Sequence, residues 1–64
     1  MPTITVSGPA TDVGRKRKLA DGLTRAAAEA YGLPLESIVV IIQENSPENV
    51  ARGGVLLADR QPRS

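Results

Sequence analysis

Five consecutive apolar residues, Ile38-Val39-Val40-Ile41-Ile42, constrain the fold of this chain more than any other stretch. All five are β-branched, and such side chains favour a strand. The run has no alternation of apolar and polar residues, which is typical of a strand buried on both faces, as in a parallel sheet. A chain of 64 residues has few elements with which to cover two sheet faces. The run therefore predicts both a strand and a need for further covering surface.

A second strand and a helix precede this run. The alternation Thr3-Ile4-Thr5-Val6 predicts a strand that begins directly after Pro2. Thr11 or Asp12 is a good N-cap for a helix that ends at Tyr31, with Gly32 at the C′ position. Its apolar residues recur at spacings of three and four and form one stripe: Leu19, Ala20, Leu23, Ala26, Ala27, Ala30 and Tyr31. Strand, helix and strand predict an α/β (or α+β) fold built on a β-α-β unit with parallel strands and a right-handed crossover.

The remainder of the chain predicts a short C-terminal hairpin and a tail. Gly53-Gly54 allows positive φ in a tight turn before the apolar run Val55-Leu56-Leu57. Residues Ala58 to Ser64 are polar, and we expect a frayed tail there. The whole chain, residues 1–64, forms one domain. The helix covers one sheet face and no other element can cover the second, so we expect homo-oligomerisation to complete the fold.

Composition excludes several classes of chemistry. Cysteine and histidine are both absent, which excludes disulfides, thiol catalysis, His-based triads and zinc sites with Cys or His ligands. The net charge of +1 and the single aromatic residue, Tyr31, argue against a nucleic-acid partner. No apolar run approaches the roughly 18 residues of a membrane span, and no secretory signal opens the chain. We expect a cytoplasmic protein without metal or cofactor.

The Met1-Pro2 pair is the sharpest chemical feature. Proline is a small penultimate residue, so we expect removal of Met1, which would leave Pro2 with a free secondary amine. An α-amine has a reference pKa of roughly 7.7–8.0, and burial or nearby cations lower it. Such an amine, held by a strand, could act as a general base at neutral pH. The alternative is that the Met1-Pro2 pair has no catalytic role, because many chains begin with Met-Pro. With Met1 attached, the Pro2 nitrogen is an amide and cannot act as a base.

Two groups of basic residues are candidates for anion binding. Arg15-Lys16-Arg17-Lys18 lies near the predicted helix start, where one or two side chains could bind an anion with help from the helix N-terminus. The alternative is a solvated face, because four consecutive helical residues point in four directions. Arg52 adjoins Gly53-Gly54, and a guanidinium suits bidentate recognition of a carboxylate. The alternative to this anion-binding role is that Arg52 is an exposed loop arginine that pairs with Glu48 or with no side chain.

The chain resembles the 4-oxalocrotonate tautomerase family, in particular its small DmpI-like members. The resemblance rests on stretches that follow one another over nearly the whole chain. They are Met1-Pro2 before a strand, the Asp12-to-Tyr31 helix with Lys16-Arg17-Lys18-Leu19, Gly32-Leu33-Pro34, Ile38 to Glu44, and Glu48 to Gly54.

The resemblance implies a β-α-β protomer that dimerises into a four-stranded sheet and commonly assembles into a hexamer. It also implies an isomerase in which Pro2 is the catalytic base. In the family, that base moves a proton from the enol of a 2-hydroxydienoate such as 2-hydroxymuconate to a distant carbon, giving a conjugated ketone. Arginines from neighbouring subunits bind the carboxylates of the small 2-oxo acid.

The chain departs from the family pattern at the positions that would bind substrate. One family arginine falls at Pro9 or Ala10, a second at Val39, and the aromatic wall of the site at Val50. Arg52 could replace one lost cation, and Arg15, Lys16 or Arg17 the other. Two alternatives to tautomerase activity stay open: another superfamily reaction on an unsaturated acid (hydration, dehalogenation or decarboxylation), or a non-catalytic oligomeric binding scaffold.

Overall fold

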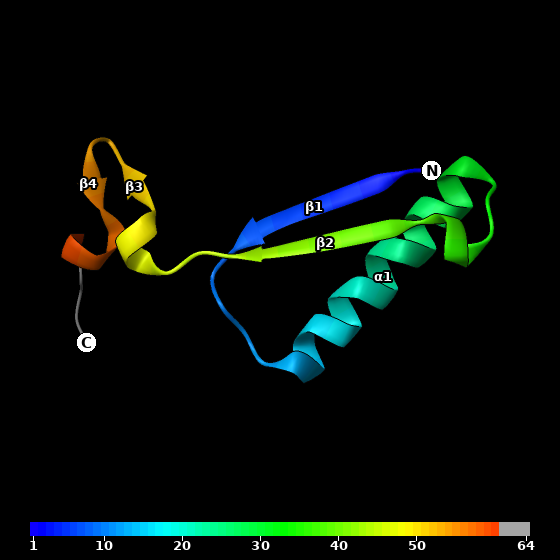
Figure 1. The fold of residues 1–64 in the computed structure, drawn as a ribbon, viewed down its shortest axis with the longest axis horizontal. Helices are drawn as coiled ribbons and strands as arrows, with labels where there is room; N and C mark the ends of the chain where they lie inside the picture. Colours follow the sequence, from blue (N-terminus) through cyan, green and yellow to red (C-terminus); the bar gives the residue numbers. More distant parts are fainter. Residues whose placement is uncertain (61–64) are drawn as a thin grey trace.

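The structure, a computed structural model, describes residues 1–60 and contains a β-α-β unit followed by a small hairpin (Figure 1). Strand β1 is followed by the long helix α1 and by strand β2, and β3 and β4 form the hairpin. Their bounds are β1 Thr3–Gly8, α1 Val13–Tyr31, β2 Val39–Glu44, β3 Ala51–Arg52 and β4 Val55–Leu56. Three short 3-10 helices complete the order: η1 Leu35–Ser37, η2 Pro47–Asn49 and η3 Leu57–Arg60. The predicted fold class is confirmed.

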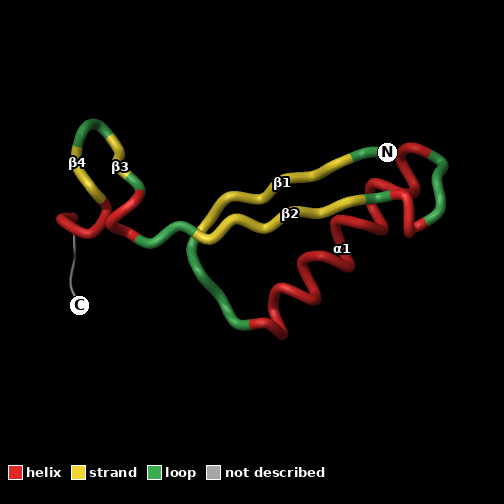
Figure 2. The backbone as a smooth tube through the Cα atoms, in the orientation of Figure 1, coloured by secondary structure: helices red, strands yellow, loops and turns green. Residues whose placement is uncertain are grey.

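Strands β1 and β2 are parallel, with a register that runs from Thr3 beside Val39 to Gly8 beside Glu44. Strand β2 begins at Val39, one residue later than the predicted run, and ends at Glu44, two polar residues beyond the end of that run. The strand extends this far because β1 continues to Gly8, which pairs with Glu44. Side chains alternate across a strand. Ile4, Val6, Val40 and Ile42 therefore share one face, on which α1 packs, as Figures 1 and 2 show.

The ends of α1 follow local sequence signals. The Asp12 side chain caps the helix by accepting a hydrogen bond from the Arg15 backbone N–H at 2.8 Å. Gly32 ends it in the left-handed region, with φ 68°, where glycine has no Cβ to clash. Both predicted caps are confirmed. The helices between residues 1 and 60 include none with the length and apolar character to cross a lipid bilayer.

The second face of the sheet is uncovered within the protomer. It carries Thr3, Thr5, Ser7, Val39, Ile41 and Gln43, and Ile41 is 44% exposed. Only Ala28 and Ile38 are buried among residues 1–60, and each keeps an exposed fraction of 8%. The protomer extends 43 × 24 × 13 Å and exposes 4912 Å², whereas a compact monomer of this mass exposes roughly 3,900 Å². Within the protomer, only one face of β2 is covered. The predicted burial of both faces of this strand requires a second copy of the chain.

The hairpin lies beyond the C-terminal ends of β1 and β2, at one end of the long axis (Figure 2). Gly53 and Gly54 turn it with φ values of 62° and 84°, as predicted. Within the predicted tail, Ala58–Arg60 belong to η3, which continues from the hairpin and contacts it through Arg60 and the Arg52 carbonyl. The Leu57 N–H donates to the Val50 carbonyl at 2.8 Å, which ties the start of η3 to the strand before the turn. The rest of the predicted tail, residues 61–64, lies outside the described residues.

Candidate active site

Pro2 is fixed at the start of the sheet. Its carbonyl accepts a hydrogen bond from the Val39 N–H at 2.9 Å, and the residue is half-buried. Met1 is 86% exposed, so its removal would cost no packing. While Met1 is attached, the Pro2 nitrogen is a tertiary amide and cannot take up a proton. The predicted base thus occupies a defined position next to Val39, the residue at which one family arginine falls.

The Pro2 end of the protomer carries no cation near the proline. The chain has no lysine or arginine in residues 1–14 or 26–51. The start of β1, the start of β2, the last turns of α1 and η1 all fall within these ranges, and their charged side chains are Glu29 and Glu36. No lysine or arginine of these elements could neutralise an anion bound at this end.

An apolar cavity of about 600 Å³ opens at the other end of the sheet, where the loops after β1 and β2 meet the hairpin. It is lined by Ser7, Gly8, Pro9, Ala10, Asn45, Ser46, Pro47, Val50 and Leu57. Asn45 holds the two loops together: its backbone N–H donates to the Gly8 carbonyl at 2.8 Å and its Nδ2 to Ser7 Oγ at 2.7 Å. The predicted wall residue Val50 does line this cavity.

Arg52 lies on β3, beside the cavity-lining part of the hairpin. Its backbone pairs with Val55, and its carbonyl accepts a hydrogen bond from Arg60 Nη2 at 3.2 Å. No acidic side chain in residues 1–60 lies within 4.0 Å of the Arg52 guanidinium, and this includes Glu48, the partner considered from sequence. The guanidinium is exposed and available to an anion.

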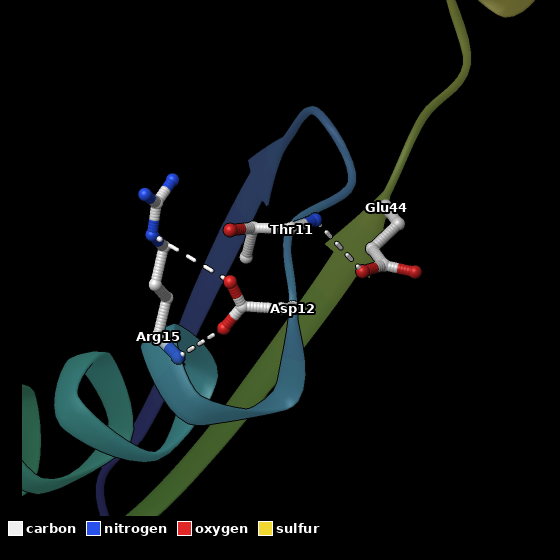
Figure 3. Close-up of polar contacts among 4 residues, drawn as sticks. All are labelled: Thr11, Asp12, Arg15 and Glu44. Atoms are coloured by element: carbon white, nitrogen blue, oxygen red, sulfur yellow. Dashed lines mark hydrogen bonds and ion pairs between the residues drawn. The ribbon is translucent and has the colours of Figure 1, made fainter.

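The basic residues at the start of α1 differ in the contacts they make. The Lys16 ammonium forms an ion pair with Glu44 at the end of β2, and is therefore engaged within the protomer. Arg15 lies 3.7 Å from the Asp12 carboxylate, and both side chains are exposed (Figure 3). Arg17 is exposed and has no ion pair within residues 1–60. Arg15 and Arg17 are thus exposed at the surface, whereas Lys16 joins two elements.

Glu44 is the centre of that junction. Its Oε2 accepts the Lys16 contact and a hydrogen bond from the Thr11 N–H at 3.3 Å, the latter drawn in Figure 3. The hydrogen bond from Lys16, and then that from Thr11, hold the pKa of the Glu44 carboxyl below its usual value, against a smaller opposing effect of desolvation. The negative charge fixes the loop Pro9–Thr11 against the end of β2. This loop forms part of the cavity wall.

Apart from the basic residues at the start of α1, the predicted site residues form two groups at opposite ends of one protomer (Figure 1). Pro2 and Val39 lie at one end, and Val50 and Arg52 at the other. The six residues of β1 each rise about 3.3 Å, which separates Pro2 from the cavity by roughly 20 Å. A small acid cannot bridge that distance.

Sequence reasoning missed several residues of the cavity end. Asn45, Pro47 and Leu57 carry no pattern that marks a wall, although the Gly53-Gly54 turn fixes the register that places Leu57 opposite Val50. Arg60 was assigned to the tail, and no sequence signal connects its side chain with the Arg52 carbonyl. No cluster of three or more acidic side chains that could hold a metal ion occurs in the described part of the chain.

Comparison with known proteins identifies the family to which this chain belongs. The sequence model of the tautomerase enzyme family matches residues 2–60, nearly the whole chain. The chain belongs to the tautomerase family. It is 44% identical over 46 residues to a probable tautomerase of Bacillus cereus, an alignment that covers 72% of this chain and 75% of that protein. The family resemblance and the β-α-β protomer expected from it are therefore confirmed.

Two solved tautomerase-family structures are similar to this protomer. DmpI from Archaeoglobus fulgidus is 46% identical with a TM-score of 0.84, covering 91% of this chain and 100% of that chain. A heterohexameric 4-oxalocrotonate tautomerase from Chloroflexus aurantiacus is 30% identical with a TM-score of 0.80, covering 95% and 98% of the two chains. Oligomeric assembly therefore occurs among the structural relatives of this tautomerase-family chain.

Proposed function

We propose that this protein is an enol–keto tautomerase that acts on a small 2-hydroxydienoate or 2-oxo acid, such as 2-hydroxymuconate. The general base is the secondary amine of Pro2, exposed after removal of Met1. Membership of the tautomerase family and the fixed, half-buried position of Pro2 at the start of β1 support this proposal.

The reaction is a proton transfer without net change of composition. The unprotonated amine takes the proton from the 2-hydroxyl group, and the oxygen–hydrogen electron pair becomes the new carbonyl π bond. The conjugated double bonds shift along the chain, and the ammonium returns the same proton to the distant carbon. A positioned general base contributes typically 10²–10⁴-fold to such a step. No electron acceptor or cofactor is required.

The complete site is assembled between copies of the chain in this proposal. The Pro2 end supplies a base with apolar surroundings and no nearby cation, whereas the cavity end, roughly 20 Å away, supplies apolar walls and Arg52. Cations near the developing oxyanion lower the barrier most when water is excluded. The uncovered sheet face and the excess exposed surface support assembly of this kind, from a dimer to a hexamer.

The test is ketonisation of 2-hydroxymuconate, followed by absorbance, with protein whose mass shows that Met1 has been removed. We expect a rate above buffer that falls by roughly 10²–10⁴-fold in Pro2→Ala. Oligomer size, measured in parallel, is expected to be the same for both proteins. A rate equal to wild type in protein that retains Met1, in which the Pro2 nitrogen is an amide, would refute the amine mechanism. An assembled wild type without a rate on any 2-hydroxydienoate would favour the non-catalytic scaffold.

A further inference from the structure

The cavity at the hairpin end has a wall without charge. None of the residues that line it, from the loops after β1 and β2 and from the hairpin, is acidic or basic. An ionised carboxylate that enters such surroundings loses its hydration without gaining a partner, whereas a hydrocarbon group is favoured there. The volume of about 600 Å³ is typical of a ligand pocket. The wall therefore favours an uncharged group of a ligand.

The polar side chains of the wall are neutral, and two of them are paired with each other. Asn45 Nδ2 donates to Ser7 Oγ at 2.7 Å, and the Asn45 backbone N–H donates to the Gly8 carbonyl at 2.8 Å. The Ser7 hydroxyl keeps one proton that it can donate. A neutral donor of this kind forms a hydrogen bond about half as strong as one from a charged group. The wall thus has no side chain that compensates a buried carboxylate.

The charged side chains around the wall add no positive charge to it. Glu44 directly precedes the wall residues that follow β2, and Glu48 directly follows them. The Lys16 ammonium is engaged in its ion pair with Glu44. Arg52 and Arg60 belong to β3 and η3 and are not among the lining residues. A carboxylate inside the cavity would have acidic neighbours along this loop and no basic side chain in the wall.

We propose that the cavity binds the hydrocarbon end of an unsaturated monocarboxylic acid, so that the preferred substrate carries an uncharged group at the end far from its 2-hydroxy acid group. This inference rests on the proposed function and narrows its substrate to the 2-hydroxydienoates with an apolar far end. Val50 and Leu57, joined by the hydrogen bond from the Leu57 N–H to the Val50 carbonyl, supply apolar side chains against which that end packs.

The first experiment compares the binding of two acids that share one six-carbon skeleton. Sorbate ends in a methyl group and muconate in a second carboxylate, and neither has the 2-hydroxyl group that ketonisation requires. In titration calorimetry with the assembled wild-type protein, we expect sorbate to bind at least roughly 10-fold more tightly than muconate. Equal or tighter binding of muconate would overturn the proposal. Absence of saturable sorbate binding would also overturn it, and would indicate that another copy fills the cavity.

The second experiment places a charge in the wall. Ala10→Arg is expected to reverse the preference, because a guanidinium in the wall pairs with the second carboxylate of muconate. Gly22→Arg adds the same charge at an exposed position of α1, where an added Cβ would meet no other element within 4 Å, and should keep the preference for sorbate. If Ala10→Arg does not assemble, Ser46→Arg places the charge on the other loop of the wall. An unchanged preference in an assembled wall variant would show that the acids bind elsewhere, contrary to the proposal.

The third experiment carries the comparison to turnover. The enols 2-hydroxyhexa-2,4-dienoate and 2-hydroxymuconate differ at the far end in the same way as sorbate and muconate. With kcat/KM divided by the spontaneous rate of each enol in the same buffer, we expect a rate enhancement at least roughly 10-fold larger for the monoacid. An equal or larger enhancement for 2-hydroxymuconate would refute the monoacid preference and leave the tautomerase proposal intact. Ketonisation of neither enol by a protein that binds sorbate in preference to muconate would refute the tautomerase proposal and leave the ligand class of the cavity intact.

Discussion

The two ends of the protomer differ in every property that matters for acid–base chemistry. The Pro2 end offers a potential base, an ordered strand start and only acidic charges nearby. The hairpin end offers an apolar cavity and Arg52, which has no ion pair within residues 1–60. Neither end alone can deprotonate and hold an anionic substrate. In the proposed mechanism the site is divided over the length of the chain, and assembly of copies brings its two halves together.

The largest effect on activity is expected from a substitution that prevents assembly of the copies. Ile41 is 44% exposed on the uncovered sheet face. We expect Ile41→Asp to place an unpaired charge in the interface and weaken association by roughly 3–5 kcal/mol per copy. Light scattering after size-exclusion chromatography should show a smaller species, with tautomerase activity falling to the level of buffer. Lys18→Ala, at an exposed helix position, should keep the wild-type size. An active, unassociated Ile41→Asp protein would show that one copy carries a whole site.

A moderate effect is expected at the junction of Glu44 with Lys16 and Thr11. The folded-state pKa of Glu44 is lowered, so its contribution to stability is present above the unfolded pKa and is lost as pH falls through the folded value. Glu44→Gln should therefore be less stable than wild type at pH 7, and the difference should shrink below about pH 4. Urea unfolding at several pH values measures it. A difference that stays constant with pH would contradict the ionic origin.

Glu44→Gln should also affect activity, and in a way that distinguishes the two ends of the protomer. Glu44 fixes the Pro9–Thr11 loop, which belongs to the cavity end and not to the Pro2 end. We expect Glu44→Gln to raise KM with little change in kcat or in the pH dependence of the base. Arg25, paired with Asp21 on α1, provides a control ion pair outside the site. Arg25→Gln should leave KM unchanged.

The smallest expected effect concerns the start of α1. Asp12 caps the helix through the Arg15 N–H at 2.8 Å. Asp12→Ala should reduce the free energy of unfolding by about 1 kcal/mol, and Asp12→Asn, which retains a capping oxygen, by much less. Equal losses in the two variants would show that the charge of Asp12 near Arg15, and not its cap, is what stabilises the helix.

The β-α-β unit was predictable because each of its elements carries a local signal. The β-branched run set β2, the alternation after Pro2 set β1, and Asp12 and Gly32 set the ends of α1. Gly53-Gly54 likewise identified the hairpin. These signals depend on residues close in sequence, so a single chain reveals them.

The site was less predictable because its contacts join residues far apart in the chain. The Lys16–Glu44 ion pair depends on how the start of α1 meets the end of β2, and no spacing encodes that geometry. The η3 helix depends on the Leu57–Val50 and Arg60–Arg52 hydrogen bonds, which overrode the polar composition read as a frayed tail. Arg52 was singled out by its glycine neighbours, whereas its position on the cavity side follows only from the hairpin register.

Titration of the Pro2 amine in the assembled protein tests the central claim most directly. Protein with Met1 removed and with ¹⁵N-labelled proline is followed by NMR between pH 5 and 10, and the titration is repeated with disassembled Ile41→Asp. An amine placed against the apolar cavity and Arg52 of another copy should titrate at clearly lower pH in the assembly than after disassembly. The same titration midpoint in both states would contradict a site shared between copies.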